Sequence, residues 1–470
     1  MRNQNLNRGA DAVFEEELSL RMLLRFALPT ILSLLVNTFY NIADQIFIGH
    51  GMGYLGNAAV NVVFPVMSFS VAVSALISDG AAAYMSLALG RKERDKASDT
   101  VVAALILAVV CGLAITVVGQ QIARPLLDFL AATEAIAEMA LTYLRIILLG
   151  IPMVLLSTVL TGLIRADGSP RYAMFCMVPG CLVNIVLDAL FIFAFSWGIA
   201  GAAWATVIGQ AVNLAVALVY LPRFRTVELR RQGRRKLFSV ARGFLWLGIA
   251  GFVSQFAGTV YTVFVNRHLE YYGALSVYGA DIPLAVFGIM MKVGQIAMCF
   301  MNGIAVGIQP ILGYNYGRRR YDRVKSCMKT AVLVATGFGV IAFGIFVGLP
   351  RYIMLLFGQS DPVYLDFGVK CFRIFLLAAP VYGFSIVSIA LFQALGKPMH
   401  STFMALAQRT IYFLPLIALL ARRYGVMGVL YASPVSDVFA CITCGVLFAR
   451  EWRRLSRPEH SIHPYEQKRL

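Results

Sequence analysis

The sequence predicts an all-α polytopic membrane protein with twelve transmembrane helices in two six-helix lobes. Three observations support this: the composition, a series of apolar spans separated by basic loops, and an internal repeat. Of 470 residues, 59% are hydrophobic and only 14% are charged, whereas about a quarter of the residues in soluble proteins are charged. In water such a chain would expose large apolar patches, so lipid is the expected solvent.

Twelve apolar spans carry the transmembrane prediction. Each is long enough to cross a bilayer, which takes about 20 residues of helix. Turn-forming or charged residues separate consecutive spans. The spans cover residues 26–48, 58–88, 98–118, 140–164, 172–195, 199–221, 244–267, 282–313, 329–350, 367–395, 401–421 and 425–449.

The basic residues are distributed unevenly between the loops. Strongly basic loops follow the even-numbered spans, and the longest covers residues 223–243. Because Lys and Arg mark cytoplasmic loops, we expect both termini in the cytoplasm. The net charge of +17 is spread over these short loops without forming one basic face, which argues against a nucleic-acid partner.

Three separate matches show that the two halves repeat. The segments 152–170 and 380–398 each begin and end with proline and have a glycine two residues before the last proline. All three positions match at an offset of 228 residues. LALGRKERDKA (87–97) matches YNYGRRRYDRV (314–324), and Gly198 matches Gly425, both at an offset of 227. Six helices per repeat give both halves one orientation, so we expect a parallel repeat with substrate near the midplane. The expected domains are an N-terminal lobe (1–222), a cytoplasmic loop (223–243), a C-terminal lobe (244–450) and a cytoplasmic tail (451–470).

Asp44 is the first candidate functional residue, because a charge at a helix centre costs about 2.5–3.5 kcal/mol on insertion scales. Asn37 and Asn41 precede it at helical spacing and form a polar stripe with it, and Tyr40 lies one turn before it. Pro29, upstream in the same span, is the expected hinge because proline permits a bend.

Asn184 and Asp188 in the fifth span form the second candidate group. Their spacing of four residues places an amide and a carboxylate on one helix face. If this face shares a cavity with Asp44, two carboxylates in a medium of low dielectric constant favour binding of a proton or another cation. The alternative is a set of polar residues that only stabilises contacts between helices.

Four further charged residues lie in apolar spans as secondary candidates: Asp79, Lys292, Arg409 and Asp437. We expect the two cations to pair with carboxylates or helix carbonyls. Met290, Met291, Met298 and Met301 could provide an adaptable binding wall, although the pattern favours ordinary core or lipid-facing packing of these methionines.

The sequence contains no constellation typical of an enzyme or a metal site. Cys441 and Cys444 form a CxxC inside an apolar span without a second pair. All five histidines lie in loops, helix ends or the tail. We therefore expect no catalytic residues, no bound metal and no cofactor apart from a coupling ion.

These segments together resemble the multidrug and toxic compound extrusion (MATE) family, with details closest to its MepA-like bacterial branch. The resemblance rests on NIADQIFIG (41–49), GRKERDKA (90–97), IRADGSP (164–170), NIVLD (184–188) and the repeat, and it covers residues 20–450. It implies a V-shaped transporter that exchanges H⁺ or Na⁺ for cationic, lipophilic drugs. The acidic cluster of relatives falls on Asp44, Asn184 and Asp188. A second cluster known in one branch is missing, because Ser254 and Gln255 stand in the seventh span and the tenth has no acid.

We therefore expect a secondary active multidrug antiporter that works as a monomer by alternating access and contacts membrane lipid. One alternative is a lipid-linked precursor flippase of the same superfamily, which would need a cationic cavity. The other is an intramembrane lipid-modifying enzyme, which the absence of a nucleophile with a base makes the weakest interpretation.

Overall fold

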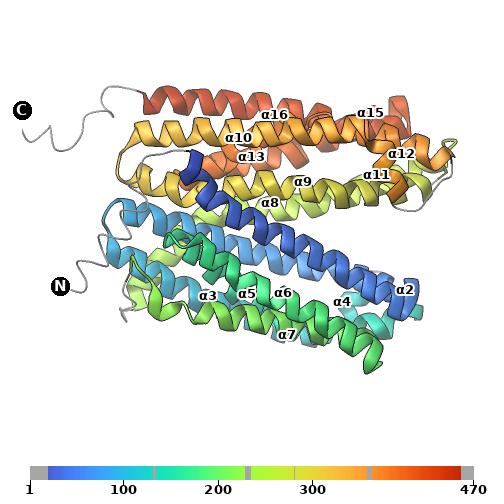
Figure 1. Cartoon of the computed structure of the whole chain (residues 1–470), viewed down its shortest axis with the longest axis horizontal. Helices are drawn as coiled ribbons and strands as arrows, with labels where there is room; N and C mark the ends of the chain where they lie inside the picture. The colour runs from blue at the N-terminus through green and yellow to red at the C-terminus, as the bar shows by residue number, and fades with distance from the viewer. Residues whose placement is uncertain (1–19, 131–133, 228–233, 280, 357–361, 457–470) are drawn as a thin grey trace, which may run out of the picture. The chain divides into compact units, whose positions relative to one another are not determined.

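The computed structural model describes residues 20–130, 134–227, 234–279, 281–356 and 362–456. Within these ranges the chain is almost entirely helical and contains no strand. The first half comprises α2 (Leu20–Gly90), α3 (Arg94–Gln121), α4 (Ala123–Phe129), α5 (Glu134–Ala166), α6 (Pro170–Ala189), the π-helix η1 (Leu190–Ala194), α7 (Gly198–Leu218) and the 3₁₀ turn η2 (Leu221–Arg223) (Figure 1).

The second half comprises α8 (Arg234–Ala274), α9 (Asp281–Gly317), α10 (Tyr321–Gly348), α11 (Pro350–Leu356), α12 (Pro362–Phe375), α13 (Ala379–Ala394), α14 (Pro398–Leu406), the π-helix η3 (Ala407–Ile411), α15 (Phe413–Tyr424) and α16 (Val426–Leu455). In the described chain, eleven segments are long and apolar enough to cross a membrane. The twelfth is the pair α12 and α13, bent by 46° at its break. The predicted fold class is confirmed, and α2 alone contains the first two spans, Met22–Met52 and Leu55–Gly90.

The backbone itself repeats at the offset read from the sequence. Left-handed φ angles occur at Lys92 (63°) and Arg319 (59°), at Gly168 (83°) and Gly396 (74°), and at Gly198 (57°) and Gly425 (61°). Because L-residues rarely adopt positive φ, three matched pairs are strong evidence for one duplicated design. The short helices α4 and α11 begin at matched positions as well.

The described chain packs as two compact units whose borders lie inside helices. Of the described residues, unit 1 contains those within 28–255, and unit 2 contains those within 20–27 and 256–456. The first residues of α2 thus pack in unit 2 and the first half of α8 in unit 1. The domain limits expected from the sequence divide the chain by its repeat and place all of the seventh span in the C-terminal lobe. Packing units are a different division of the chain, so those limits stay a prediction.

Close backbone contacts at glycine explain why these helix segments pack where they do. In unit 1, a Cβ at Gly80 would lie 2.1 Å from the carbonyl oxygen of Phe244, and a Cβ at Gly248 would lie 1.7 Å from that of Leu76. In unit 2, a Cβ at Gly307 would lie 2.8 Å from the Cα of Ala27. Gly80 and Gly307 are matched positions of the repeat, so both halves use glycine for the same close helix contact.

A buried carboxylate anchors the loop between α5 and α6. Asp167 accepts hydrogen bonds from the Tyr220 hydroxyl (2.8 Å), the Arg225 N–H (2.9 Å), the Thr226 N–H (2.9 Å) and the Thr226 hydroxyl. In the second half, the corresponding loop is held by an ion pair between Lys397 and Glu451. Both halves therefore tie this loop to the end of their last helix, with different chemistry.

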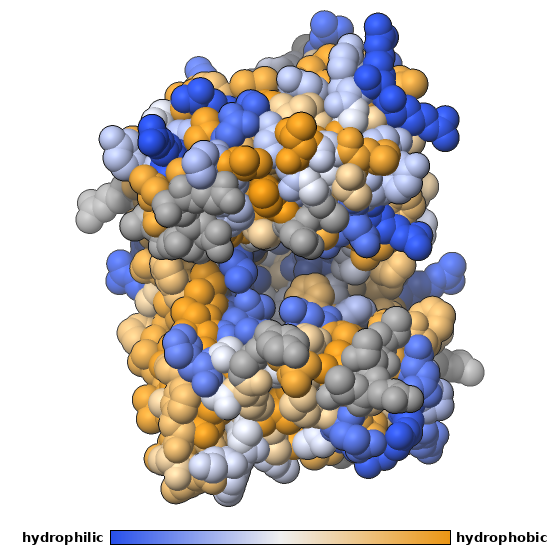
Figure 2. All heavy atoms as spheres, turned by 90° about the vertical axis from the view of Figure 1, so that its right-hand side faces the viewer, coloured by the Kyte–Doolittle hydropathy of each residue, from blue (hydrophilic) through white to orange (hydrophobic). Residues whose placement is uncertain are grey.

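Two further features are visible at the surface. Figure 2 shows apolar side chains gathered along the left edge of the lower half of the view. Independently of that view, exposed Ile106, Val110, Leu113 and Val117 form an apolar face along α3. A lipid-facing surface has this character.

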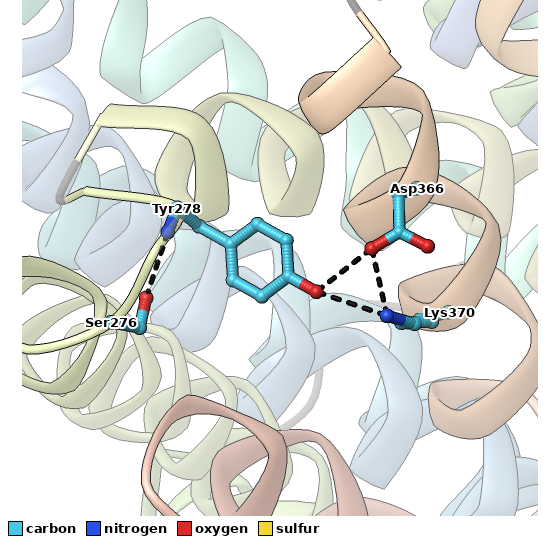
Figure 3. Close-up of polar contacts among 4 residues, drawn as sticks. All are labelled: Ser276, Tyr278, Asp366 and Lys370. Carbon is cyan, nitrogen blue, oxygen red and sulfur yellow. Dashed lines mark hydrogen bonds and ion pairs between the residues drawn. The ribbon is translucent and has the colours of Figure 1, made fainter.

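A cluster of polar side chains ties the connection between α8 and α9 to α12 in unit 2. The hydroxyl of Tyr278 donates to Asp366 (2.8 Å) and accepts from Lys370 (3.0 Å) (Figure 3).

Candidate ion and substrate sites

A buried pair of carboxyl groups lies in unit 1. Asp44 of α2 and Asp188 of α6 are hydrogen-bonding neighbours, and the residues are 8% and 0% exposed. In each, the Oδ1 atom is buried without a hydrogen-bond partner in the described chain. Two adjacent carboxylates repel each other strongly in a medium of low dielectric constant, so this arrangement is suited to holding a proton or a small cation.

Asn184 supports the pair from one turn earlier on α6. With its amide nitrogen facing Asp188, it donates to Oδ2 of that carboxyl at 3.1 Å, and its oxygen accepts from the Thr206 N–H at 3.1 Å. The residue is 2% exposed. The amide therefore fixes the orientation of Asp188 through α7.

Two tyrosines complete the surroundings of the carboxyl pair. Tyr40 of α2 lies beside Asp44 and Asp188 and is within hydrogen-bonding reach of Thr206. Tyr143 of α5 is close enough to the same carboxyl groups and to Tyr40 to interact electrostatically with them. The site thus draws on α2, α5, α6 and α7.

The other two residues of the predicted polar stripe on α2 bond to each other. Asn41 is exposed, and its amide donates to the Asn37 carbonyl at 2.7 Å and to the Asn37 side chain at 3.2 Å. Pro29 lies inside α2, two residues after the chain passes from unit 2 to unit 1. The hinge at Pro29 stays a prediction.

The secondary candidates separate into three places. Asp79 faces Arg165 in unit 1, where the α8 backbone passes so closely that a Cβ at Gly251 would lie 2.7 Å from Asp79 Oδ2. Lys292 of α9 is exposed. Only Arg409 and Asp437 come together, at a cavity within unit 2.

This unit 2 cavity has a volume of about 130 Å³ and lies between α8, α9, α13, η3 and α16. Met290, Met291 and Met298 contribute to its wall, so three of the four methionines that the sequence raised line a cavity, whereas Met301 is buried elsewhere in α9. Its polar groups are Tyr261, Tyr382, Gln408, Arg409, Ser433, Ser436 and Asp437 among others.

Hydrogen bonds fix the polar groups of the unit 2 cavity. Arg409 Nη2 donates to the Tyr382 hydroxyl at 2.8 Å, and Gln408 Nε2 donates to Asp437 Oδ1 at 2.9 Å. The Ser436 hydroxyl donates to the Gln408 carbonyl at 2.7 Å. Both Gln408 and Arg409 lie in the π-helix η3, a type of helix that occurs often at functional sites.

Sequence reasoning missed the neutral partners in both places. Tyr143 and Thr206 in unit 1, and Tyr382 and Gln408 in unit 2, are uncharged polar residues in apolar spans. The one available signal was the position of Gln408 beside Arg409. The others become visible only when the helices are packed.

A helical membrane protein with duplicated halves and a buried carboxyl pair falls in the class of polytopic membrane transporters. The MatE family model matches residues 29–190 and 251–417, one segment in each half. The chain therefore belongs to the MatE family of transporters and is not an enzyme.

Individual relatives agree over nearly the whole chain. The multidrug export protein MepA of Staphylococcus haemolyticus is 24% identical over 429 residues, covering 90% of this chain and 92% of that protein. A multidrug resistance MATE family transporter solved in an outward-facing conformation has a TM-score of 0.85 at 22% identity, covering 92% and 96%. A MOP superfamily transporter from Pyrococcus furiosus, described as having a binding pocket of reverse polarity that suggests a different function, has the same score and identity, covering 93% and 96%.

Proposed function

We propose that this chain is an antiporter that exports cationic amphipathic compounds in exchange for H⁺ or Na⁺. The observation that carries the proposal is the contact between Asp44 and Asp188, each with one oxygen that lacks a partner within the described residues. Similarity to multidrug export proteins supports the drug substrates.

Exchange follows from competition for one negative site. With both carboxyl groups ionised, the pair attracts a cationic drug or a small cation. Binding of the small cation from outside removes that charge, weakens drug binding and favours the inward-facing state. A membrane potential of 100 mV contributes about 2.3 kcal/mol per charge moved. Differential affinity of the two states for the drug provides the remaining bias.

Ethidium efflux in everted vesicles tests this proposal. We expect Asp44→Asn and Asp188→Asn each to abolish efflux driven by a proton or sodium gradient. Asp128→Asn is the matched control, because Asp128 is an exposed acid on α4 of the same unit. Full gradient-driven efflux by both pair variants would refute the exchange. Running the two gradients separately identifies the coupling ion.

Transport of a lipid-linked anionic precursor is the second candidate function. The observation that favours it is Arg409 at the unit 2 cavity, together with the reverse-polarity relative of the same fold. The acidic pair in unit 1 favours drug export instead. Reconstituted vesicles that translocate a lipid pyrophosphate but not ethidium would support the flippase.

The cellular setting belongs to the same proposal. We place both termini in the cytoplasm, because Lys and Arg concentrate in one set of loops. Similarity to staphylococcal export proteins supports a bacterial inner membrane, and we propose that the chain works there as a monomer. Part of the longest basic loop and the end of the tail lie outside the described residues. Protease accessibility of tags at the two termini in sealed vesicles tests the orientation.

A further inference from the structure

The unit 2 cavity contains a cation without a directly paired anion. Within the described chain, no carboxylate lies within 4 Å of the Arg409 guanidinium. The hydrogen bond it makes there goes to the neutral hydroxyl of Tyr382, and its Cζ lies 5.7 Å from the Tyr261 ring centre. A guanidinium has five N–H donors, and a desolvated charge without a partner is costly. The free donors point to an anionic ligand group.

The carboxylate of Asp437 lines the same cavity and is not in contact with the Arg409 guanidinium. Asp437 is held by Gln408 and interacts with Arg409 electrostatically, without an ion pair between them. A carboxylate ligand alone would be attracted by Arg409 and repelled by Asp437. The complementary ligand therefore carries both charges.

The local backbone fixes this arrangement. Gln408 and Arg409 are consecutive residues of the π-helix η3, whose extra residue per turn displaces them from the spacing of an α-helix. Ser436 bonds to the Gln408 carbonyl and so anchors η3 to α16. The charges are thus set in place before any ligand binds, which lowers the cost of binding.

Apart from Gln295 and Ser433, the remaining wall is mainly apolar, and the cavity is about the size of those that hold one aromatic ring. Met290, Met298 and Phe413 contribute to it, and methionine makes favourable contacts with aromatic rings. A cavity of about 130 Å³ is close to the size of cavities that bind benzene, roughly 150 Å³.

We propose that the unit 2 cavity binds an aromatic ring that bears both a carboxylate and a basic nitrogen, with the carboxylate on Arg409 and the nitrogen at Asp437. This goes beyond cation exchange at Asp44 and Asp188, because it adds a zwitterion site in the other unit.

Calorimetric titration of the purified full chain in nanodiscs tests the site. The probes are the meta and para isomers of aminomethylbenzoate, with benzoate and benzylamine as single-charge controls. We expect one aminomethylbenzoate isomer to bind at least tenfold more tightly than either control. Arg409→Gln should weaken that binding at least tenfold and strengthen benzylamine binding. Asp437→Asn should weaken it similarly and strengthen benzoate binding.

Two variants locate the effect. Lys292→Gln removes an exposed cation of the same unit, and Asp44→Asn disables the unit 1 pair, so neither should change binding by as much as twofold. Loss of binding in Asp44→Asn would place the ligand in unit 1 and overturn this inference while leaving the exchange proposal intact.

Equal affinities for the four compounds, or no measurable binding of the zwitterions, would also overturn it. So would unchanged affinity in charge variants that keep the wild-type thermal midpoint. If Arg409→Gln fails to fold, Arg409→Lys replaces it: the retained charge should leave intermediate affinity, and affinity equal to wild type would argue against recognition by the guanidinium.

Discussion

Replacing Asp44 with Asn should stabilise the protein while it abolishes coupled transport. In the wild type, two buried carboxyl groups are hydrogen-bonding neighbours, and each has an unpartnered oxygen within the described chain. An amide at position 44 removes one charge and can donate to Asp188. A hydrogen bond to a charged group contributes about 1.5–3 kcal/mol, so we expect the free energy of unfolding to rise by about 1–3 kcal/mol.

The stability gained by Asp44→Asn should increase as the pH rises. At low pH the wild-type pair holds a proton and can form its own hydrogen bond, so Asp44→Asn gains little there. As the pH rises the wild type acquires a second buried charge and loses stability relative to the variant. At pH 9 we expect a rise in thermal midpoint of about 2–6 °C.

Thermal unfolding of purified protein between pH 5 and 9 checks this, with Asp128→Asn as the exposed control. A variant less stable than wild type at pH 9, or a difference that does not change with pH, would refute the argument that the two carboxyl groups share one site.

Three other substitutions probe the fold and the hinge. Gly248→Ala would place a Cβ 1.7 Å from the carbonyl oxygen of Leu76, so we expect a loss of about 1–3 kcal/mol, seen as a lower midpoint in a thermal-shift assay. Gly288→Ala in the helix α9, whose Cβ would meet nothing within 4 Å, should not lower the midpoint. Pro29→Ala restores a helical N–H and removes the clash of the proline ring with the preceding turn. It should raise the thermal midpoint and slow ethidium efflux, and unchanged efflux would remove Pro29 from the mechanism. Asp167→Asn replaces a carboxylate that accepts from four donors with an amide that brings its own N–H group, so urea or thermal unfolding should show a loss of about 1–3 kcal/mol; wild-type stability would show that the loop anchor is dispensable.

Most of the fold could be read from the sequence because hydropathy and duplication are strong signals. The twelve apolar spans and the offset of the repeat both reappear in the structure, the latter as left-handed residues at matched positions such as Gly168 and Gly396. The bend between α12 and α13 could not be foreseen from hydropathy alone. The sequence also did not predict that α2 begins in unit 2 and α8 begins in unit 1. These positions depend on the close contacts at Gly307 and Gly80, which become visible only when the helices are packed.

The candidate sites were predictable in their charges and not in their neutral partners. Asp44 and Asp188 stood out because a charge in an apolar span is expensive. Helical spacing also suggested Asn37 and Asn41, yet Asn41 is exposed and bonds to Asn37. Periodicity identifies one face of a helix; which part of that face another helix covers is decided by packing.

The most direct test of the central claim is drug binding measured against the two candidate coupling ions. Ethidium affinity of the purified protein should fall at least tenfold either when the pH drops from 8 to 5 or when Na⁺ rises from zero to 100 mM. The same change should be absent from Asp188→Asn. Wild-type affinity that is constant across both titrations would contradict a shared site for drug and ion.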